Sequence, residues 1–132
     1  MKKIILILPV ILLLCSSSVA QKSKTMTPGN FAHTVYFWLK NPDNQSDREA
    51  FETSLKKFIH QSIFIKTKHI GVPASTSRDV IDNSYTYSLL LTFANKDDQD
   101  KYQEEPAHQI FIAESSSLWK KVVVYDSENI LK

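Results

Sequence analysis

The sequence predicts an α+β domain in which an antiparallel four-stranded sheet carries helices on one face. Three observations lead to this prediction. Some segments alternate apolar and polar residues as strands do, others repeat apolar residues at helical spacing, and Pro, Gly, Asn or Asp residues break the chain between them. Taken in order, the segments give the succession β-α-β-β-α-α-β.

The N-terminus predicts a secretory signal peptide over residues 1–20. A charged start at Lys2 and Lys3 precedes an apolar run from Ile4 to Leu14, and small residues stand before the expected cleavage after Ala20. The run is shorter than the roughly 20 residues of a membrane-spanning helix. We therefore expect export to the periplasm or the extracellular space, and no membrane span in the mature chain.

Cys15 offers a second route, because a cysteine after the apolar run can become the lipidated first residue of a bacterial lipoprotein. Leu14 stands before it, where that processing favours a small residue. We expect lipidation less than cleavage after Ala20. Cleavage there would remove the only cysteine and leave the mature protein without thiol or disulfide chemistry.

The charge balance argues against nucleic acid as a partner. The chain has 16 Lys and Arg and 14 Asp and Glu residues, and loss of Lys2 and Lys3 with the signal would leave 14 of each sign. No basic stripe with interleaved aromatics is present. The four histidines are scattered and there are only two glycines, so we expect neither a metal nor a phosphate-binding cofactor.

The first half of the domain begins after a polar tether over residues 21–30. The segment from His33 to Leu39 is β-branched and aromatic on both faces, which predicts a strand covered on both sides. Ser46 with Glu49 forms a capping-box pattern at the start of an amphipathic helix. A strand over residues 63–70 and a polar loop over residues 74–84 follow.

The second half continues with the clearest strand, Tyr85 to Phe93, whose odd-numbered residues should face the core. Asn95 is placed to cap a short helix, and Pro106 to start the next one. Val122 to Asp126 should form the last strand. We therefore expect the domain to span residues 31–126, with residues 127–132 as a tail.

This order of elements is that of a ferredoxin-like unit, which leaves one sheet face without helices. Two large aromatic residues occupy that face if the alternation holds. Its expected residues are Thr34, Tyr36, Trp38, Thr86, Ser88, Leu90 and Thr92.

The spacing of Tyr102, Pro106-Ala107-His108, Trp119 and Tyr125-Asp126 carries a resemblance to a known family. From about Phe31 to Asp126 the chain resembles the stress-responsive dimeric α/β-barrel (Dabb) domain family. The resemblance implies that two sheets meet face to face and form a barrel, and therefore a homodimer.

His33, Tyr102 and His108 are the candidate catalytic residues. His33 shares the parity of the core-facing strand residues, His108 begins a helix on that side, and Tyr102 precedes it by six residues. Two imidazoles and a phenol suit proton abstraction next to a carbonyl. Plant polyketide cyclases of the resembled family match at these three positions, but Ser54 stands near the place of a tyrosine in their pocket.

The alternatives for these residues are structural. His33 and His108 lie at element ends, where unpaired backbone groups need partners, and Tyr102 suits the edge of a core. The sequence therefore leaves two interpretations. In the first, an exported dimeric barrel binds a small, partly apolar organic molecule between sheet and helices, with cofactor-free His/Tyr acid–base chemistry. In the second, a non-catalytic envelope protein uses the barrel only to dimerise.

Overall fold

The structure is a computed structural model and describes residues 27–131. The expected signal peptide, Cys15 and the tether as far as residue 26 lie outside the described residues. Within residues 27–131, no helix has the length and apolar character needed to cross a membrane.

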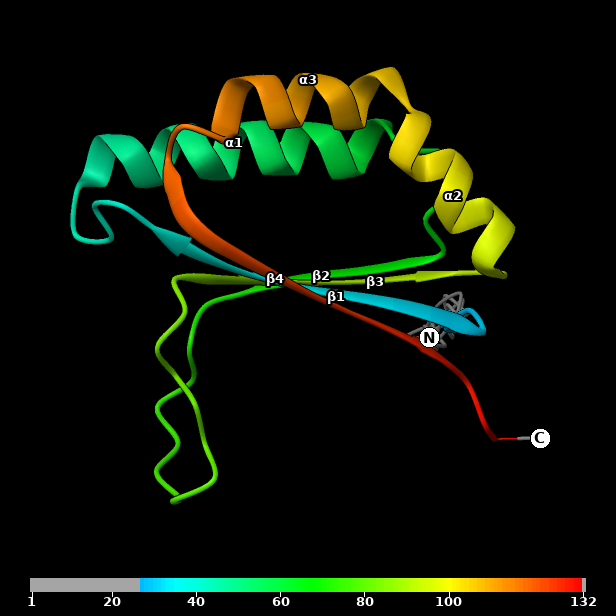
Figure 1. Ribbon diagram of the computed structural model, residues 1–132, viewed down its shortest axis with the longest axis horizontal. Helices are drawn as coiled ribbons and strands as arrows, with labels where there is room; N and C mark the ends of the chain where they lie inside the picture. The colour runs from blue at the N-terminus through cyan, green and yellow to red at the C-terminus, as the bar shows by residue number, and fades with distance from the viewer. Residues whose placement is uncertain (1–26, 132) are drawn as a thin grey trace, which may run out of the picture.

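The observed elements follow the predicted order β-α-β-β-α-α-β (Figure 1). They are β1 (Phe31–Leu39), α1 (Gln45–Gln61), β2 (Thr67–Gly71), β3 (Tyr87–Phe93), α2 (Lys96–Glu104), α3 (Pro106–Ser115) and β4 (Trp119–Glu128). The last strand continues past Asp126, where the domain was expected to end.

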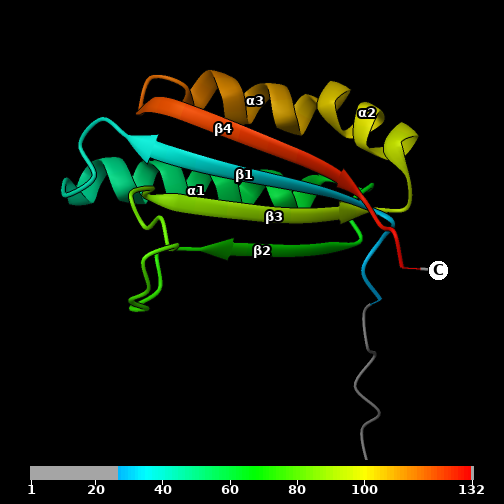
Figure 2. The ribbon, with the colours of Figure 1, turned by 60° about the horizontal axis from the view of Figure 1, so that its bottom comes forward.

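The four strands form one antiparallel sheet in the order β2-β3-β1-β4 (Figure 2). All three helices lie over the same face, and the loop over residues 72–86 projects from the opposite side (Figure 1). This arrangement confirms the ferredoxin-like α+β prediction. It also leaves β4 at an edge of the sheet, with its whole length paired to the central strand β1.

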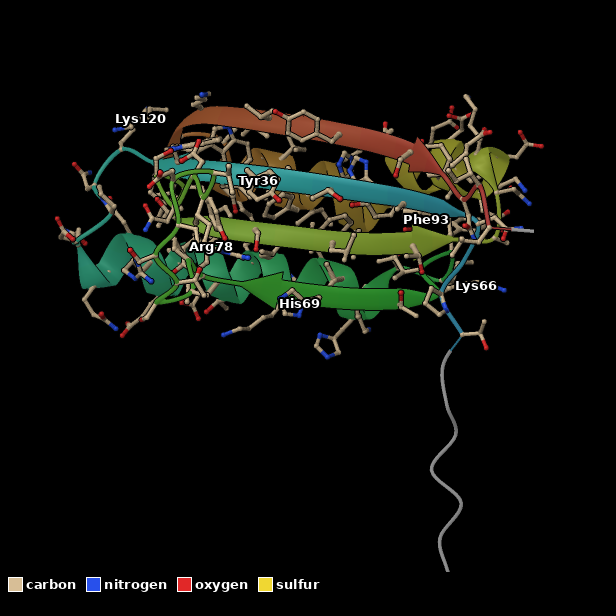
Figure 3. All side chains as sticks on the ribbon, turned by 90° about the horizontal axis from the view of Figure 1, so that it is seen from below. Tyr36, Lys66, His69, Arg78, Phe93 and Lys120 are labelled. Carbon is tan, nitrogen blue, oxygen red and sulfur yellow. The ribbon has the colours of Figure 1, made fainter. Side chains whose placement is uncertain are left out.

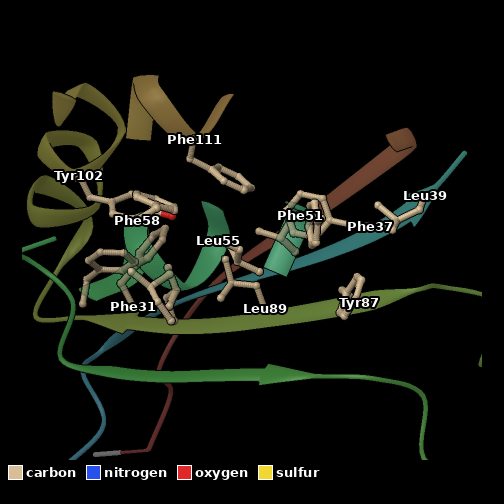
Figure 4. Close-up of a cluster of buried hydrophobic side chains, with 14 residues drawn as sticks. Phe31, Phe37, Leu39, Phe51, Leu55, Phe58, Tyr87, Leu89, Tyr102 and Phe111 are labelled. Carbon is tan, nitrogen blue, oxygen red and sulfur yellow. The ribbon is translucent and has the colours of Figure 1, made fainter. Parts of the chain in front are cut away.

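The core lies between the sheet and the helices and is mainly aromatic (Figure 4). Alternate residues of β1 from Phe31 to Leu39 are buried, because successive side chains of a strand point to opposite faces. The rings of Phe58 on α1 and Phe111 on α3 stack with centroids 5.2 Å apart. Such aromatic pairs stabilise the fold beyond the effect of burying their area, and they favour one orientation of the two helices against each other.

The second strand begins later than predicted. Ile63 is 82% exposed, and its backbone N–H donates to the Glu105 carboxylate instead of to a strand. Ser62 ends α1, so the residues after it serve as a connection. The first sheet-like bond of this segment runs from Lys66 N to Thr92 O, immediately before β2.

The cap of α1 also differs from the prediction. The N-cap is Asn44, whose Oδ1 accepts a hydrogen bond from the backbone N–H of Asp47 at 3.0 Å. Ser46 lies inside the first turn and is exposed, so the capping box with Glu49 does not form. The helix starts at Gln45 because the asparagine offers a cap before the serine is reached.

Replacement of the cap should therefore affect stability where replacement of Ser46 does not. We expect Asn44→Ala to lower the free energy of unfolding by about 1 kcal/mol, since one backbone N–H of the first turn loses its partner. Ser46→Ala should change it by less than about 0.5 kcal/mol. Urea unfolding of both variants checks this. A larger loss of unfolding free energy in Ser46→Ala than in Asn44→Ala would show that Ser46 caps the helix instead.

Candidate functional site

A cavity of about 220 Å³ lies between the sheet and the helices. Its polar lining residues are His33 on β1, Tyr102 and Gln103 at the end of α2 and His108 at the start of α3. Apolar side chains form the rest of the wall. They include Phe37, Phe58, Leu89, Phe111, Trp119 and Val122.

The cavity opens between α3 and β4. Ile112 and Val124 line it from these two elements and are themselves 38% and 46% exposed. The polar atoms and the apolar wall are thus both within reach of a molecule that enters from this side. Sites for small molecules commonly combine an apolar wall with a few placed polar groups in this way.

His33 is buried and is held by Asp126 on the neighbouring strand. The two residues are direct partners in the β1–β4 register, and Nδ1 of His33 lies 2.6 Å from Oδ1 of Asp126. A carboxylate only accepts hydrogen bonds, so Nδ1 must carry the proton. In the neutral ring, Nε2 then has a free lone pair and can accept a proton.

His108 has the same tautomer for a different reason. Its Nδ1 lies 3.1 Å from the carbonyl oxygen of Gln103, which can only accept, so Nδ1 is again the donor. Burial lowers the pKa of His108 below its usual value, the hydrogen bond to Gln103 opposes that shift, and the charge of a protonated His33 would lower the pKa further. The ring is therefore neutral near pH 7, with Nε2 as the acceptor.

Tyr102 lies between the two imidazoles. Its ring centroid is 5.9 Å from that of His33 and 5.3 Å from that of His108. Burial raises the pKa of the phenol well above its usual value, and the nearby carboxylates of Glu105 and Asp126 add to the shift. The hydroxyl is therefore a neutral hydrogen-bond donor at any physiological pH.

These functional atoms are open to the cavity. Across residues 27–131, the Tyr102 hydroxyl and the two Nε2 atoms have no protein hydrogen-bond partner. In the same part of the chain, three polar side-chain atoms are sealed, which means that they are shielded from solvent and have no hydrogen-bond partner; they belong to Ser62, Glu105 and Ser115. The Tyr102 hydroxyl and the two Nε2 atoms are not among them. Atoms that are neither bonded nor sealed must face free space, and the residues that carry them line this cavity.

All three residues predicted from the sequence are thus brought together, and Asp126 is a fourth that the prediction missed. The signal that could have found it is strand pairing, because His33 and Asp126 both face the helices on adjacent antiparallel strands. Ser54 does not belong to this cavity. Its hydroxyl donates to Glu114 at 2.6 Å, between α1 and α3.

The described residues hold no group of three or more His, Cys, Asp or Glu side chains arranged for a metal ion. A larger hollow of about 320 Å³ lies where β1 begins and β4 ends, but its charged lining is limited to Lys96 and Glu128. It combines neither a histidine nor a phenol with an apolar wall. The cavity at His33 is therefore the better candidate for chemistry.

Comparison with known proteins gives one family match and many similar structures. The model of the stress responsive A/B barrel domain matches residues 31–129. Among curated proteins, no relative matches the chain in sequence.

Solved structures share the fold at low sequence identity. A hydroxynitrile lyase from Passiflora edulis has a TM-score of 0.66 and 17% identity, with 80% of this chain and 99% of that chain covered. A Dabb family protein with a ferredoxin-like fold from Mesorhizobium loti has a TM-score of 0.63 and 20% identity, with 76% and 96% covered. A dimeric ferredoxin-like protein from Thermobifida fusca has a TM-score of 0.61 and 16% identity, with 75% and 90% covered.

The lowered pKa of His108 predicts how stability depends on pH. The unfolded chain takes up a proton on this residue near its ordinary pKa of about 6.5, whereas the folded protein resists it until lower pH. Its contribution to stability is therefore complete above that value and is lost as the pH falls through the folded pKa.

We expect the free energy of unfolding of the wild type to fall more steeply from about pH 7 to pH 5 than that of His108→Asn. Asparagine places an N–H donor where Nδ1 stands, so it can keep the bond to Gln103 without the titration. Urea unfolding at several pH values measures both slopes. Parallel slopes would show that the folded state does not disfavour protonation of His108.

Proposed function

The chain belongs to the stress responsive A/B barrel domain family. We propose that it is an exported protein that binds a small, partly apolar carbonyl compound. The ligand would lie in the cavity between sheet and helices, and His33, Tyr102 and His108 would act on it without a cofactor. One observation carries this proposal. Two imidazoles, each tied through Nδ1, present free Nε2 atoms to an apolar cavity that also holds an unpartnered phenol.

The proposed step is proton transfer next to a carbonyl. Nε2 of His33 takes the proton from the carbon beside the carbonyl, and the electron pair of that bond passes into an enolate. The Tyr102 hydroxyl donates to the enolate oxygen, where the negative charge develops. Asp126 stabilises the imidazolium that forms on His33, because its carboxylate lies at 2.6 Å from Nδ1.

His108 has the complementary part in this proposal. It stays neutral, since burial lowers its pKa, and its Nε2 can accept a hydrogen bond from a hydroxyl of the ligand or from a water molecule. It would thus orient the substrate while His33 moves the proton.

The volume limits the size of the ligand. A dry cavity of about 150 Å³ accommodates benzene, so the 220 Å³ found here suit about one ring with a short substituent. That a protein of the same fold is a hydroxynitrile lyase supports an enzyme on this scaffold. At 17% identity it does not identify the substrate.

A second candidate is a non-catalytic envelope protein whose barrel serves dimerisation. It is favoured by the sheet face without helices, where Tyr36 and Trp38 are only partly covered and Tyr125 is 62% exposed. Both candidates include a homodimer, in which that face of one copy meets the same face of another. Similar structures that are dimeric support this assembly.

Loss of the Tyr102 hydroxyl should separate function from stability. We expect Tyr102→Phe to abolish turnover of small ketones and aldehydes while the free energy of unfolding changes by less than about 1 kcal/mol, since no protein group bonds the hydroxyl. His33→Gln should also abolish exchange of the proton beside the carbonyl. The measurement is deuterium exchange into a panel of one-ring carbonyl compounds, followed by NMR.

Two results would contradict the enzyme. The first is that no compound in the panel exchanges faster with the wild type than with Tyr102→Phe and His33→Gln. The second is that Tyr102→Phe lowers stability as a core defect does, by about 3 kcal/mol or more. Either would favour the non-catalytic candidate.

The homodimer predicts that charge on the open face splits the copies. Tyr125→Glu should yield monomers in sedimentation experiments, because the carboxylate would be buried without a partner at the interface. Ile110→Glu on α3 is the control, since this residue is 44% exposed but lies on a helix beyond the other face. A Tyr125→Glu protein that remains dimeric would rule out this face as the interface.

Export predicts the N-terminus of the mature protein. Sequencing of the protein from its native source should begin at Gln21, because small residues precede it. A lipidated Cys15 as first residue would instead make it a membrane-anchored lipoprotein. Detection of uncleaved Met1 would contradict export by either route.

A further inference from the structure

The junction between α2 and α3 holds two of the functional residues of the cavity. Glu105 is the single residue between these helices, which end at Glu104 and begin at Pro106. Its backbone N–H donates to the carbonyl oxygen of Tyr102 at 3.2 Å, and its own carbonyl oxygen accepts from the N–H of His108 at 3.0 Å. One residue is thus bonded directly to both Tyr102 and His108.

The side chain of Glu105 reaches a third element. It does not cap α3, which has no side-chain cap. Instead, Oε1 accepts a hydrogen bond at 3.0 Å from the backbone N–H of Ile63, immediately after the end of α1. The other oxygen, Oε2, is shielded from solvent and has no partner among the described residues. Burial of an unpaired carboxylate oxygen is costly, so stability alone does not account for a glutamate in this place.

The end of α1 is also the part of that helix on which both rings pack. The ring centroid of Phe58 is 5.3 Å from that of Tyr102 and 5.2 Å from that of His108. Ser62, the residue before Ile63, donates its N–H to the carbonyl oxygen of Phe58 at 3.1 Å. The ring contacts and the hydrogen bond to the carboxylate therefore lie about one helical turn apart. A shift of the junction away from α1 would move both rings off the wall of the cavity.

The charge of Glu105 acts on the same two residues. Burial lowers the pKa of His108, and this charge opposes the shift. Burial also raises the pKa of Tyr102, and the same charge adds to that shift. The other groups that face His108 are the phenol of Tyr102 from α2, the imidazole of His33 from β1 and the apolar ring of Phe58 from α1. The carboxylate is thus a close charged neighbour of the site.

We propose that Glu105 is a positioning residue of the cavity, whose hydrogen bond to Ile63 holds the α2–α3 junction against α1. It would keep the Tyr102 hydroxyl and the His108 ring in place around the ligand. As a role in proton transfer this rests on the proposed function, but the hydrogen bond itself does not. The junction lies on the helix-covered side of the sheet, whereas a second copy would cover the open face, on which Tyr36 lies (Figure 3).

Two substitutions separate the reach of the side chain from its charge. Glu105→Gln keeps an oxygen acceptor at the same distance from the backbone and removes the charge. Glu105→Asp keeps the charge but is one methylene too short for the N–H of Ile63. Aspartate is a preferred N-cap residue and α3 has no side-chain cap, so this variant should fold.

The first measurement is deuterium exchange into the one-ring carbonyl compounds that the wild type accepts. We expect the rate to fall about tenfold to a hundredfold in Glu105→Asp, because a small misplacement of the reacting groups is costly, and to change less than about threefold in Glu105→Gln. A residue that served stability alone would tolerate aspartate at least as well as glutamine.

The second measurement is NMR without a substrate. Nuclear Overhauser contacts from the Phe58 ring to the rings of Tyr102 and His108 should weaken in Glu105→Asp and persist in Glu105→Gln. The pKa of His108 should fall in Glu105→Gln, because the charge that favours the protonated ring is lost. Glu104→Gln is the matched control, since it removes the same charge from the exposed preceding residue and should change neither quantity.

Ring contacts in Glu105→Asp that equal those of the wild type would overturn the proposal. So would an equal loss of ring contacts in Glu105→Gln and Glu105→Asp, since the reach of the side chain would then not matter. If the wild type exchanges no compound of the panel, the proposed function fails. The ring contacts and the pKa of His108 would in that case still decide whether Glu105 positions the junction.

Discussion

The register between β1 and β4 is the constraint on which the rest of the structure depends. It sets His33 opposite Asp126, Val35 opposite Val124 and Phe37 opposite Val122, all on the face toward the helices. A slip by one residue would turn every side chain of β4 to the other face. The cavity would lose part of its apolar wall, and His33 would be buried without its carboxylate.

A buried imidazole at the centre of an aromatic core is costly unless its polar atoms are satisfied. Asp126 satisfies Nδ1 of His33, and a backbone carbonyl satisfies Nδ1 of His108. The Nε2 atoms and the Tyr102 hydroxyl are left open to the cavity. Residues chosen only for stability would not leave three such atoms together without partners, because apolar residues of similar size would fill the space at lower cost.

Much of this arrangement follows from local pattern. The period of two in β1 and β3 places their odd-numbered residues in the core, and Pro106 sets the start of α3 and with it the position of His108. What the pattern does not contain is the pairing of distant segments. Asp126 could not be assigned to His33 without the register. The hydrogen bond of the Ile63 N–H to the Glu105 carboxylate, where a strand partner was expected, is likewise a tertiary contact that the local pattern does not contain.

The central claim is that both imidazoles are held with the proton on Nδ1 and the lone pair on Nε2. Nitrogen-15 NMR of the histidine rings at about pH 8, above the ordinary histidine pKa of about 6.5, tests it directly, with signals assigned through His33→Gln and His108→Asn. The account predicts the Nδ1–H tautomer for both residues, although free histidine prefers the other form. An Nε2–H tautomer at either residue would contradict it, since that ring could not accept a proton from a ligand in the cavity.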